Sequence, residues 1–117
     1  MVDAIWVSNH GGRHTDESLS TIELLQSIAA AVGGKIPILF DGGVRSGYDA
    51  LKAFALGADY VFAGRPFVYG LGSEGQEGVV KVMDLMEEEL LEAMAICGVR
   101  SVKEARSKGI LVKRARL

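Results

Sequence analysis

The stretch Ala4-Ile5-Trp6-Val7-Ser8-Asn9-His10-Gly11-Gly12-Arg13 decides how this chain is interpreted. Its first four residues are an apolar run that predicts a buried strand, and glycines and polar residues follow directly. Glycines let a backbone approach a ligand closely. His10 can exchange a proton near neutral pH, and Arg13 presents a planar fork that matches a carboxylate or a phosphate. This strand end predicts a base beside an anion clamp, with a solvated turn as the alternative.

Length and composition set limits on the class of protein. The 117 residues make at most one domain, spanning 1–117, and the 49% hydrophobic and 24% charged content is ordinary for a globular protein. A net charge of −2 gives no electrostatic reason for binding nucleic acid or an anionic membrane. We see no signal peptide and no apolar run near the ~20 residues that cross a bilayer.

The single cysteine, Cys97, allows no disulfide within the chain. This fits a reducing compartment and predicts a cytoplasmic location. Cys97 falls on the apolar side of a predicted helix, so we expect a buried thiol rather than a reactive one. The last residues, Ala115-Arg116-Leu117, resemble a relaxed form of the peroxisomal Ser-Lys-Leu address, which makes a peroxisomal location the alternative.

Strand-type and helix-type segments alternate three times along the chain. Strands are expected near residues 3–7, 36–40 and 59–63, and helices near 21–32, 48–56 and 76–97. Ser20 and Glu23 have the spacing of a capping box, and Ser101 starts a short final helix by the same logic. The alternation predicts an α/β fold with parallel strands and right-handed crossovers.

The surroundings of this sheet can also be predicted. The strands are apolar runs rather than alternating ones, so we expect both faces of the sheet to be covered. A glycine-rich connection that ends at Gly78 is expected before the long helix, whose methionines, Met83 among them, are expected in the core. Three strands leave two open edges, which missing strands, a partner or a second copy should cover. The first strand begins almost at Met1, which suggests a chain that starts inside something larger.

Two further glycine-rich loops follow the second and third strands. Asp41-Gly42-Gly43-Val44-Arg45-Ser46-Gly47 exposes N–H groups just before a helix N-terminus, a setting that favours an anion. Gly64-Arg65 repeats the pairing of glycine and arginine at the next strand end. Ligands of α/β proteins bind on this side of the sheet, and barrel enzymes build a phosphate site from their last two such loops. The alternative is two tight turns with surface arginines.

The three loops together resemble those of the FMN-dependent α-hydroxy acid dehydrogenases and oxidases, the family of glycolate oxidase, lactate oxidase and membrane L-lactate dehydrogenase. The resemblance is carried by 8–13, by 41–45 and by Gly64-Arg65-Pro66, and it continues through Cys97-Gly98-Val99-Arg100-Ser101. The first motif is highly specific, whereas other phosphate-binding barrels share the other two more loosely. The resemblance implies a (β/α)8 TIM barrel, of which this chain supplies the last three strand–helix units as an incomplete barrel.

The resemblance also implies roles for individual residues. His10 matches the family's active-site base, and Arg13 matches the arginine that clamps the substrate carboxylate. The remaining matches bind the ribityl chain and phosphate of FMN, and no metal is implied. These cofactor-binding residues are Asp41, Gly42, Gly43, Arg45, Gly64 and Arg65.

Departures from the family pattern lie beside the first motif. The family usually continues with Gln and Leu where this chain has His14 and Thr15, while Asp16 is retained. A proline that is common before the next helix is Leu19 here. We interpret His14 as a loop histidine rather than a second base. The departures bear on substrate preference and loop geometry, not on the base or the clamp.

Three functions compete at this point. The first is FMN-dependent oxidation of a small 2-hydroxy acid to the 2-oxo acid, with this chain carrying the base, the clamp and the phosphate site. The second is a non-catalytic truncated or split half-barrel that needs a complement. The third is a fragment of another phosphate-binding barrel, such as one like inosine monophosphate dehydrogenase, against which the His-Gly-Gly-Arg run argues.

The resemblance places several contacts outside this chain. In the family a lysine near the flavin, a substrate-binding tyrosine and the acidic partner of the histidine belong to earlier strands. We therefore expect the chain alone to be inactive and colourless, and to form an oligomer or to need the rest of the barrel.

Overall fold

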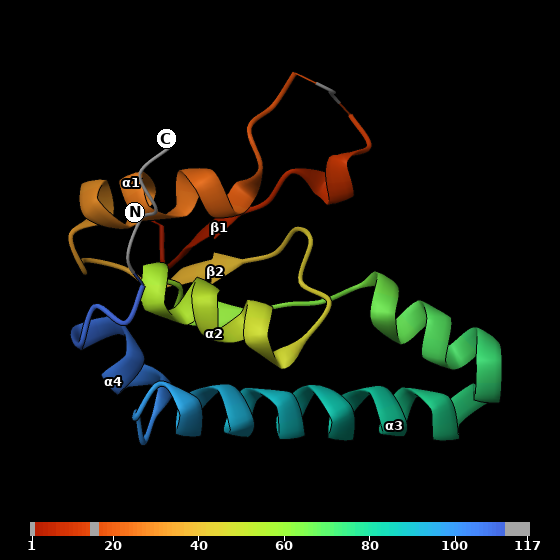
Figure 1. Ribbon diagram of the computed structural model, residues 1–117. Coiled ribbons are helices and arrows are strands. Elements are labelled where there is room, and N and C mark those ends of the chain that lie inside the picture. Colours follow the sequence, from red (N-terminus) through yellow and green to blue (C-terminus); the bar gives the residue numbers. More distant parts are fainter. Residues whose placement is uncertain (1, 15–16, 112–117) are drawn as a thin grey trace, which may run out of the picture.

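The computed structural model describes residues 2–14 and 17–111. Figure 1 shows a small sheet with helices packed against it. The elements in chain order are β1 (Ile5–Val7), η1 (His10–Gly12), α1 (Thr21–Val32), β2 (Ile38–Phe40), α2 (Gly47–Leu56), β3 (Tyr60–Val61), α3 (Arg65–Ile96) and α4 (Val102–Ser107). The strands are parallel, in the order β1-β2-β3, which confirms the predicted α/β class.

Backbone pairing continues past the short strands toward their carboxyl ends. Asp41 donates its N–H to the Val7 carbonyl at 3.1 Å, and Phe62 donates its N–H to the Phe40 carbonyl at 2.9 Å. The three chains therefore stay parallel up to the loops that follow them. These loops all leave the sheet at the carboxyl ends of its strands, on the right-hand side of Figure 1.

Polar side chains at the helix ends explain where the helices begin. The Ser20 N–H donates to the Glu23 carboxylate at 3.1 Å, which confirms the capping box of α1. Ser46 caps α2 because its hydroxyl accepts from the Asp49 N–H at 3.1 Å, and Ser101 caps α4 in the same way. The first two helices consequently begin within one residue of their expected positions.

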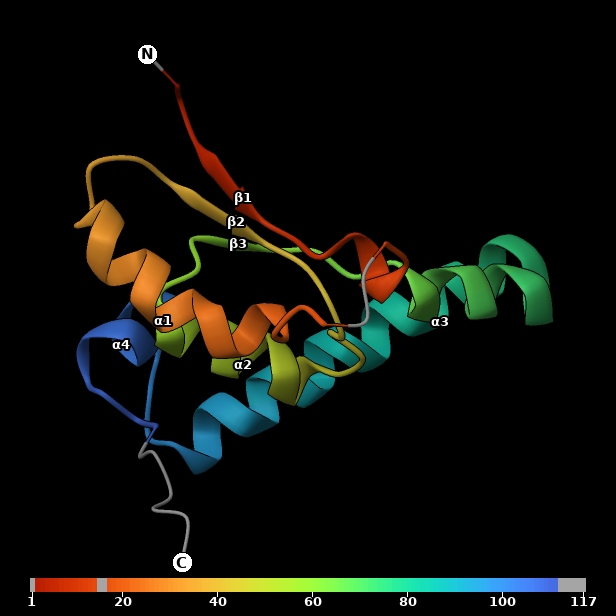
Figure 2. The ribbon, with the colours of Figure 1, turned by 90° about the horizontal axis from the view of Figure 1, so that it is seen from above.

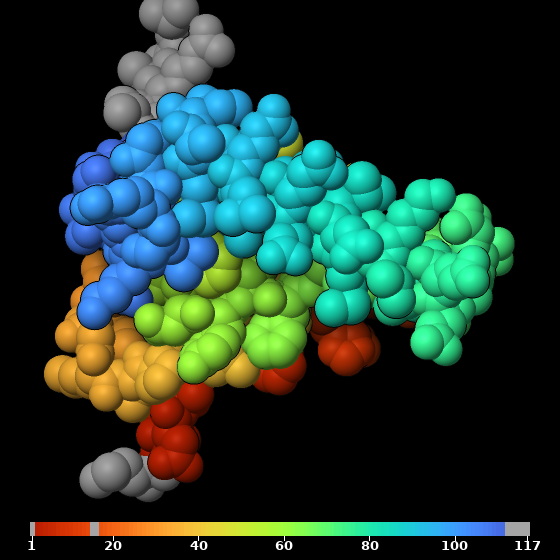
Figure 3. Space-filling model, turned by 90° about the horizontal axis from the view of Figure 1, so that it is seen from below, coloured from red at the N-terminus to blue at the C-terminus, as the bar shows by residue number. Residues whose placement is uncertain are grey.

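The connection expected before Gly78 is helical, which corrects the sequence interpretation. Helix α3 begins at Arg65, with Pro66 in its first turn, and breaks at Gly75, where φ is 61° and ψ is −137°. The chain then turns back, and this turn projects from the body of the molecule (Figure 3). A Cβ on Gly70 or on Gly78 would collide with the carbonyl oxygen of the other. The glycines therefore permit two helical segments to cross closely rather than forming a loop.

The core lies between the sheet and helices α1 and α2. Its largest fully buried side chains are Phe40, Leu25 and Ile38, which come from β2 and α1. Each such side chain contributes about 1.5–3 kcal/mol by leaving water. A second cluster joins α2, α3 and the chain end around α4. Its buried members are Leu51, Ala93, Val99 and Ala105.

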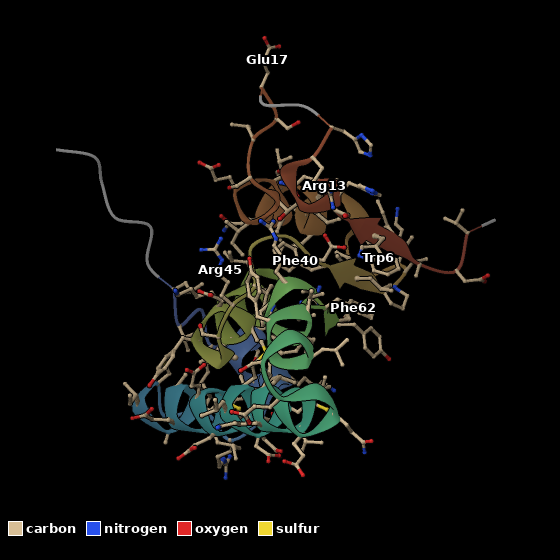
Figure 4. The ribbon with its side chains drawn as sticks, turned by 90° about the vertical axis from the view of Figure 1, so that its right-hand side faces the viewer. Trp6, Arg13, Glu17, Phe40, Arg45 and Phe62 are labelled. Carbon is tan, nitrogen blue, oxygen red and sulfur yellow. The ribbon has the colours of Figure 1, made fainter. Side chains whose placement is uncertain are left out.

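Helices α1 to α4 all lie on one side of the sheet, which corrects the expectation of two covered faces (Figure 2). On the open face Trp6, Leu39 and Tyr60 are neighbours in the strand register, and Trp6 and Tyr60 are 54% and 58% exposed. The rings of Trp6 and Phe62 lie 4.9 Å apart between centroids on this face (Figure 4). In a closed barrel the corresponding face is the packed interior, which explains why the strands are apolar on both sides.

The apolar side of α3, called here its apolar stripe, is only partly buried. Cys97 is exposed and Met83 is 57% exposed, so both predictions of burial are wrong. Met86 and Ala93 pack against the core as expected. The reason is length: α2 has 10 residues and α3 has 32, so α2 covers only part of the stripe.

Some sequence features fall beyond the structural description. Ala115-Arg116-Leu117, Thr15 and Asp16 lie outside the described residues. Within the described ranges, no helix is sufficiently long and apolar to cross a bilayer.

Candidate active site

The loops that follow the three strands meet in one cavity. Its volume is about 480 Å³, and all three loops contribute to its wall. Figure 4 views the molecule from this end and shows Arg13 and Arg45 there together. The cavity is lined by every residue for which the sequence predicts a role: His10, Arg13, Asp41, Gly42, Gly43, Arg45, Gly64 and Arg65.

His10 lies in a tight loop with a left-handed backbone. Its φ is 55°, and it is the only non-glycine residue with positive φ in the described ranges. Gly11 and Gly12 follow with φ of 69° and 73°. Glycine adopts this conformation without steric cost, whereas another residue loses roughly 1–2 kcal/mol. The conformation of His10 therefore depends on contacts that hold it.

Hydrogen bonds from the two other strand ends hold this loop. The Ser8 hydroxyl donates to Asp41 Oδ1 at 2.7 Å and accepts from the His10 N–H at 3.1 Å. Arg65 Nη2 donates to the Gly11 carbonyl at 2.9 Å. The loop after β1 is thus attached to the loops after β2 and β3. Sequence reasoning assigned no role to Ser8, although it opens the most specific motif.

The imidazole of His10 faces solvent and a second imidazole. Its ring centroid lies 4.4 Å from that of His14, with the planes tilted by 41°. No carboxylate among the described residues accepts a hydrogen bond from the His10 ring. Catalytic histidines are normally oriented by such a partner, and the His10 ring has none among the described residues. The spacing of His10 and His14 did not by itself predict their ring contact.

Unpaired N–H groups and guanidinium groups make the cavity suitable for an anion. The N–H groups of Gly42, Gly43 and Gly64 donate to no acceptor in the described part of the chain. Gly43 and Gly64 face open space where a Cβ would stand. The exposed Arg45 lines the same cavity. Because backbone N–H groups and guanidinium forks bind phosphate and carboxylate groups, these residues suit an anionic ligand.

At the N-terminus of α2, two N–H groups already have acceptors within the chain. The Gly47 N–H donates to the Glu89 carboxylate of α3 at 2.8 Å, and the Asp49 N–H donates to Ser46 Oγ at 3.1 Å. The Arg45 N–H also donates to the Asp49 carboxylate, at 3.2 Å. A negative charge from within the chain therefore occupies the helix end. The N–H groups without a described acceptor lie before the helices, in the loops that follow β2 and β3.

Gly42 is fixed between two polar side chains that sequence reasoning missed. A Cβ on Gly42 would approach Thr21 Oγ1 to 2.4 Å and Asn9 Oδ1 to 3.1 Å. Thr21 is 3% exposed, and its hydroxyl donates to the Gly42 carbonyl at 3.4 Å. Asn9 Oδ1 is buried without a hydrogen-bond partner among the described residues. Asn9 belongs to the first motif, but nothing in the sequence connects Thr21 to the second.

Comparison with known proteins leads to one family. The model of the FMN-dependent dehydrogenase family matches residues 1–112. The chain is similar to 2-hydroxyacid oxidase 2 of Mus musculus, with 52% identity over 103 residues, which are 88% of this chain and 29% of that protein. It is also 52% identical over 106 residues to L-lactate oxidase of Lysinibacillus sphaericus (strain C3-41), covering 91% of this chain and 28% of that protein.

Solved structures give the same result. The crystal structure of mandelate oxidase with benzoyl-formic acid matches with a TM-score of 0.86 and 49% identity, over 89% of this chain and 31% of that one. A mandelate oxidase variant with the monooxide FMN adduct matches with the same score and identity, over 33% of its length. These neighbours are TIM-barrel FMN oxidases, which confirms that the fold is part of such a barrel. The chain spans about a third of the length of the relatives that it matches.

Proposed function

The chain belongs to the FMN-dependent dehydrogenase family, and from this premise we propose that it supplies the base, the carboxylate clamp and the FMN phosphate site for oxidation of a small 2-hydroxy acid to the 2-oxo acid. The proposal depends on one observation: His10, Arg13 and Arg45 line a single cavity that also holds unpaired N–H groups. Relatives named as oxidases of 2-hydroxy acids and of lactate support this substrate class.

Arg13 is the residue that binds the substrate carboxylate in this proposal. Its side chain lines the cavity and makes no hydrogen bond to any described residue, so its N–H donors are free for a ligand. A guanidinium holds a carboxylate through two parallel hydrogen bonds. In a 2-hydroxy acid the reacting carbon is next to the carboxylate, so a substrate bound to Arg13 has its hydroxyl and α-hydrogen within the reach of nearby His10.

His10 is the proton acceptor of the reaction. Oxidation of the alcohol to the 2-oxo group removes two electrons and two protons, and bound FMN would take up the electron pair together with one of the protons. An imidazole nitrogen of His10 takes the other proton. His10 is exposed and lines the cavity, which supports this role.

The phosphate of FMN would lie between the loops after β2 and β3. Arg45 and the N–H groups of Gly43 and Gly64 provide donors there. Arg65 uses one N–H on the Gly11 carbonyl and keeps other donors for a phosphate oxygen. Asp41 uses Oδ1 on Ser8, and its second oxygen is available to a ribityl hydroxyl.

These residues act, we propose, together with further strands of a barrel. The described sheet has three strands, so β1 and β3 each have an edge without a partner. The face that carries Trp6 and Tyr60 is open. Three strands do not enclose a flavin. The chain alone is therefore expected to be colourless, to associate, and not to oxidise substrate.

A hybrid enzyme tests the proposal. Residues 1–112 of this chain would replace the matching segment of L-lactate oxidase from Lysinibacillus sphaericus, which is 52% identical over the aligned region. We expect a yellow protein that oxidises lactate or another small 2-hydroxy acid, while the separate 117-residue chain stays colourless. A hybrid that folds and retains FMN but oxidises none of lactate, glycolate and mandelate would contradict the proposed function.

A further inference from the structure

We propose that Ser8 is a positioning residue, which holds His10 in its left-handed conformation and connects that conformation to Asp41 at the end of β2. Ser8 Oγ is the only side-chain atom that bonds to the His10 backbone in the described part of the chain. It is also the atom that bonds to Asp41 Oδ1. One hydroxyl therefore connects two loops whose residues are 33 positions apart in the sequence.

The direction of these two hydrogen bonds is fixed by chemistry. A carboxylate only accepts hydrogen bonds, so the single hydroxyl proton of Ser8 points toward Asp41. The oxygen lone pairs then remain for the His10 N–H, which only donates. Because the acceptor is charged and the oxygens are 2.7 Å apart, the bond to Asp41 is the stronger of the two. Asp41 thereby orients the group that holds His10.

The ring of His10 has no comparable restraint of its own. It contacts the ring of His14, and it makes no hydrogen bond to a described residue. Its direction therefore follows from the backbone conformation, in which φ is 55°. Without the Ser8 hydroxyl, we expect His10 to relax toward negative φ, which changes the direction in which its ring points. This catalytic consequence rests on the proposed function, whereas the hydrogen-bond arrangement does not.

The rest of the loop is held independently of Ser8. Arg65 bonds to the Gly11 carbonyl from the far side, and the Gly12 N–H donates to the Asn9 carbonyl at 3.0 Å. Loss of the Ser8 hydroxyl is therefore expected to release His10 without unfolding the loop. Ser8 is exposed, so its substitution removes no core packing.

Amide exchange in the folded hybrid enzyme tests the structural part directly. In Ser8→Ala, NMR should show the His10 N–H exchanging with solvent roughly three- to tenfold faster, the effect of losing one hydrogen bond. Ser8→Thr keeps the hydroxyl and should restore slow exchange. Ser27→Ala is the matched control, because Ser27 bonds to Leu24 on α1 and should not affect His10. Unchanged exchange in Ser8→Ala would overturn the proposal.

Kinetics of the hybrid enzyme test the catalytic part. Ser8→Ala should lower kcat about tenfold, a change of the size expected for a displaced base, while KM stays within twofold and Ser8→Thr recovers kcat. A Ser8→Ala variant with normal kcat would overturn the positioning role. If the hybrid oxidises no 2-hydroxy acid, the proposed function fails, and the exchange measurement still decides whether Ser8 holds His10.

Discussion

The two ends of the sheet differ in how completely their polar groups are paired. At the amino end, the buried Ile38 donates its N–H to Asp59 Oδ2 at 2.8 Å, and Arg106 donates to Asp59 Oδ1 at 2.8 Å. Asp59 thereby connects β2 with α4. At the carboxyl end, the Gly43 N–H has no described partner and Asn9 Oδ1 is buried without one.

Backbone geometry shows the same contrast. The left-handed non-glycine residue of the described ranges, His10, lies at the carboxyl end. Unpaired donors and an unfavourable backbone conformation both lower stability, so a fold retains them where they serve a ligand. We therefore expect substitutions at the amino end to change stability, and substitutions at the carboxyl end to change ligand binding and turnover.

Removal of the base should affect chemistry alone. In the hybrid enzyme, His10→Ala is expected to lower turnover by about 10²–10⁴-fold, because the exposed ring makes no contact with the core. FMN absorbance and the denaturation midpoint should stay unchanged. His14→Ala is the matched control from the same loop. Loss of folding in His10→Ala would show that this end also carries stability.

Removal of a phosphate donor should affect cofactor binding. Arg45→Ala is expected to weaken FMN binding by roughly 10–100-fold, the effect of losing hydrogen bonds to a charged group. Arg65→Ala should weaken FMN binding and also lower kcat, because its guanidinium bonds to Gly11 in the His10 loop. Titration of the apo-hybrid with FMN measures the first effect. Wild-type affinity in both variants would remove the phosphate site from this cavity.

A substitution at the amino end should affect stability alone. Asp59→Ala leaves the buried Ile38 N–H without an acceptor, so the free energy of unfolding should fall by about 1–3 kcal/mol. Asp59→Asn keeps an acceptor oxygen and loses only the ion pair with Arg106, so a loss of about 0–1 kcal/mol is expected. Urea denaturation measures both values. A fall in kcat per folded molecule would contradict the division between the two ends.

Acid should produce the smallest effect, through Asp49 beside the anion site. Burial raises the pKa of Asp49, but hydrogen bonds from Lys52, the Arg45 N–H and Ser46 outweigh it, and the pKa lies below its ordinary value of 3.8. Because the pKa of Asp49 is lowered in the folded state, its ionised carboxylate stabilises the fold above pH 3.8. This stabilisation is lost as the pH falls below that value.

Asp49→Asn is the variant that isolates this contribution. Its free energy of unfolding should approach that of the wild type as the pH falls from 5 toward 2. Denaturation curves at several pH values measure the difference. A gap that widens in acid would contradict the assigned sign.

Sequence reasoning identified the parts of the fold that depend on short-range patterns. Ser20 and Ser101 marked the starts of α1 and α4, because a capping side chain acts within three residues of its own position. The carboxyl ends of parallel strands lie on the same side of the sheet. The alternation of strand-type and helix-type segments was therefore enough to predict that the three loops meet. The first motif further predicted the family that the comparisons support.

The errors arose where burial depends on other elements. The glycines between Pro66 and Gly78 indicated a loop, but Gly70 and Gly78 allow two helical segments to touch. Cys97 belongs to an apolar stripe that no described helix covers to its end. Helical periodicity shows which side of a helix is apolar, but not how much of that side another element covers.

Local sequence patterns were enough to predict the three strands, their parallel pairing and the residues that lie at their carboxyl ends. How those residues interact depends on the packing of the folded chain. The Glu89 carboxylate, 42 residues away, accepts from the Gly47 N–H and so occupies one donor at the N-terminus of α2. Ser8 and Asp41 meet across 33 residues and fix the His10 backbone. Contacts at such separations depend on the packing of whole elements, and no local spacing or propensity encodes them.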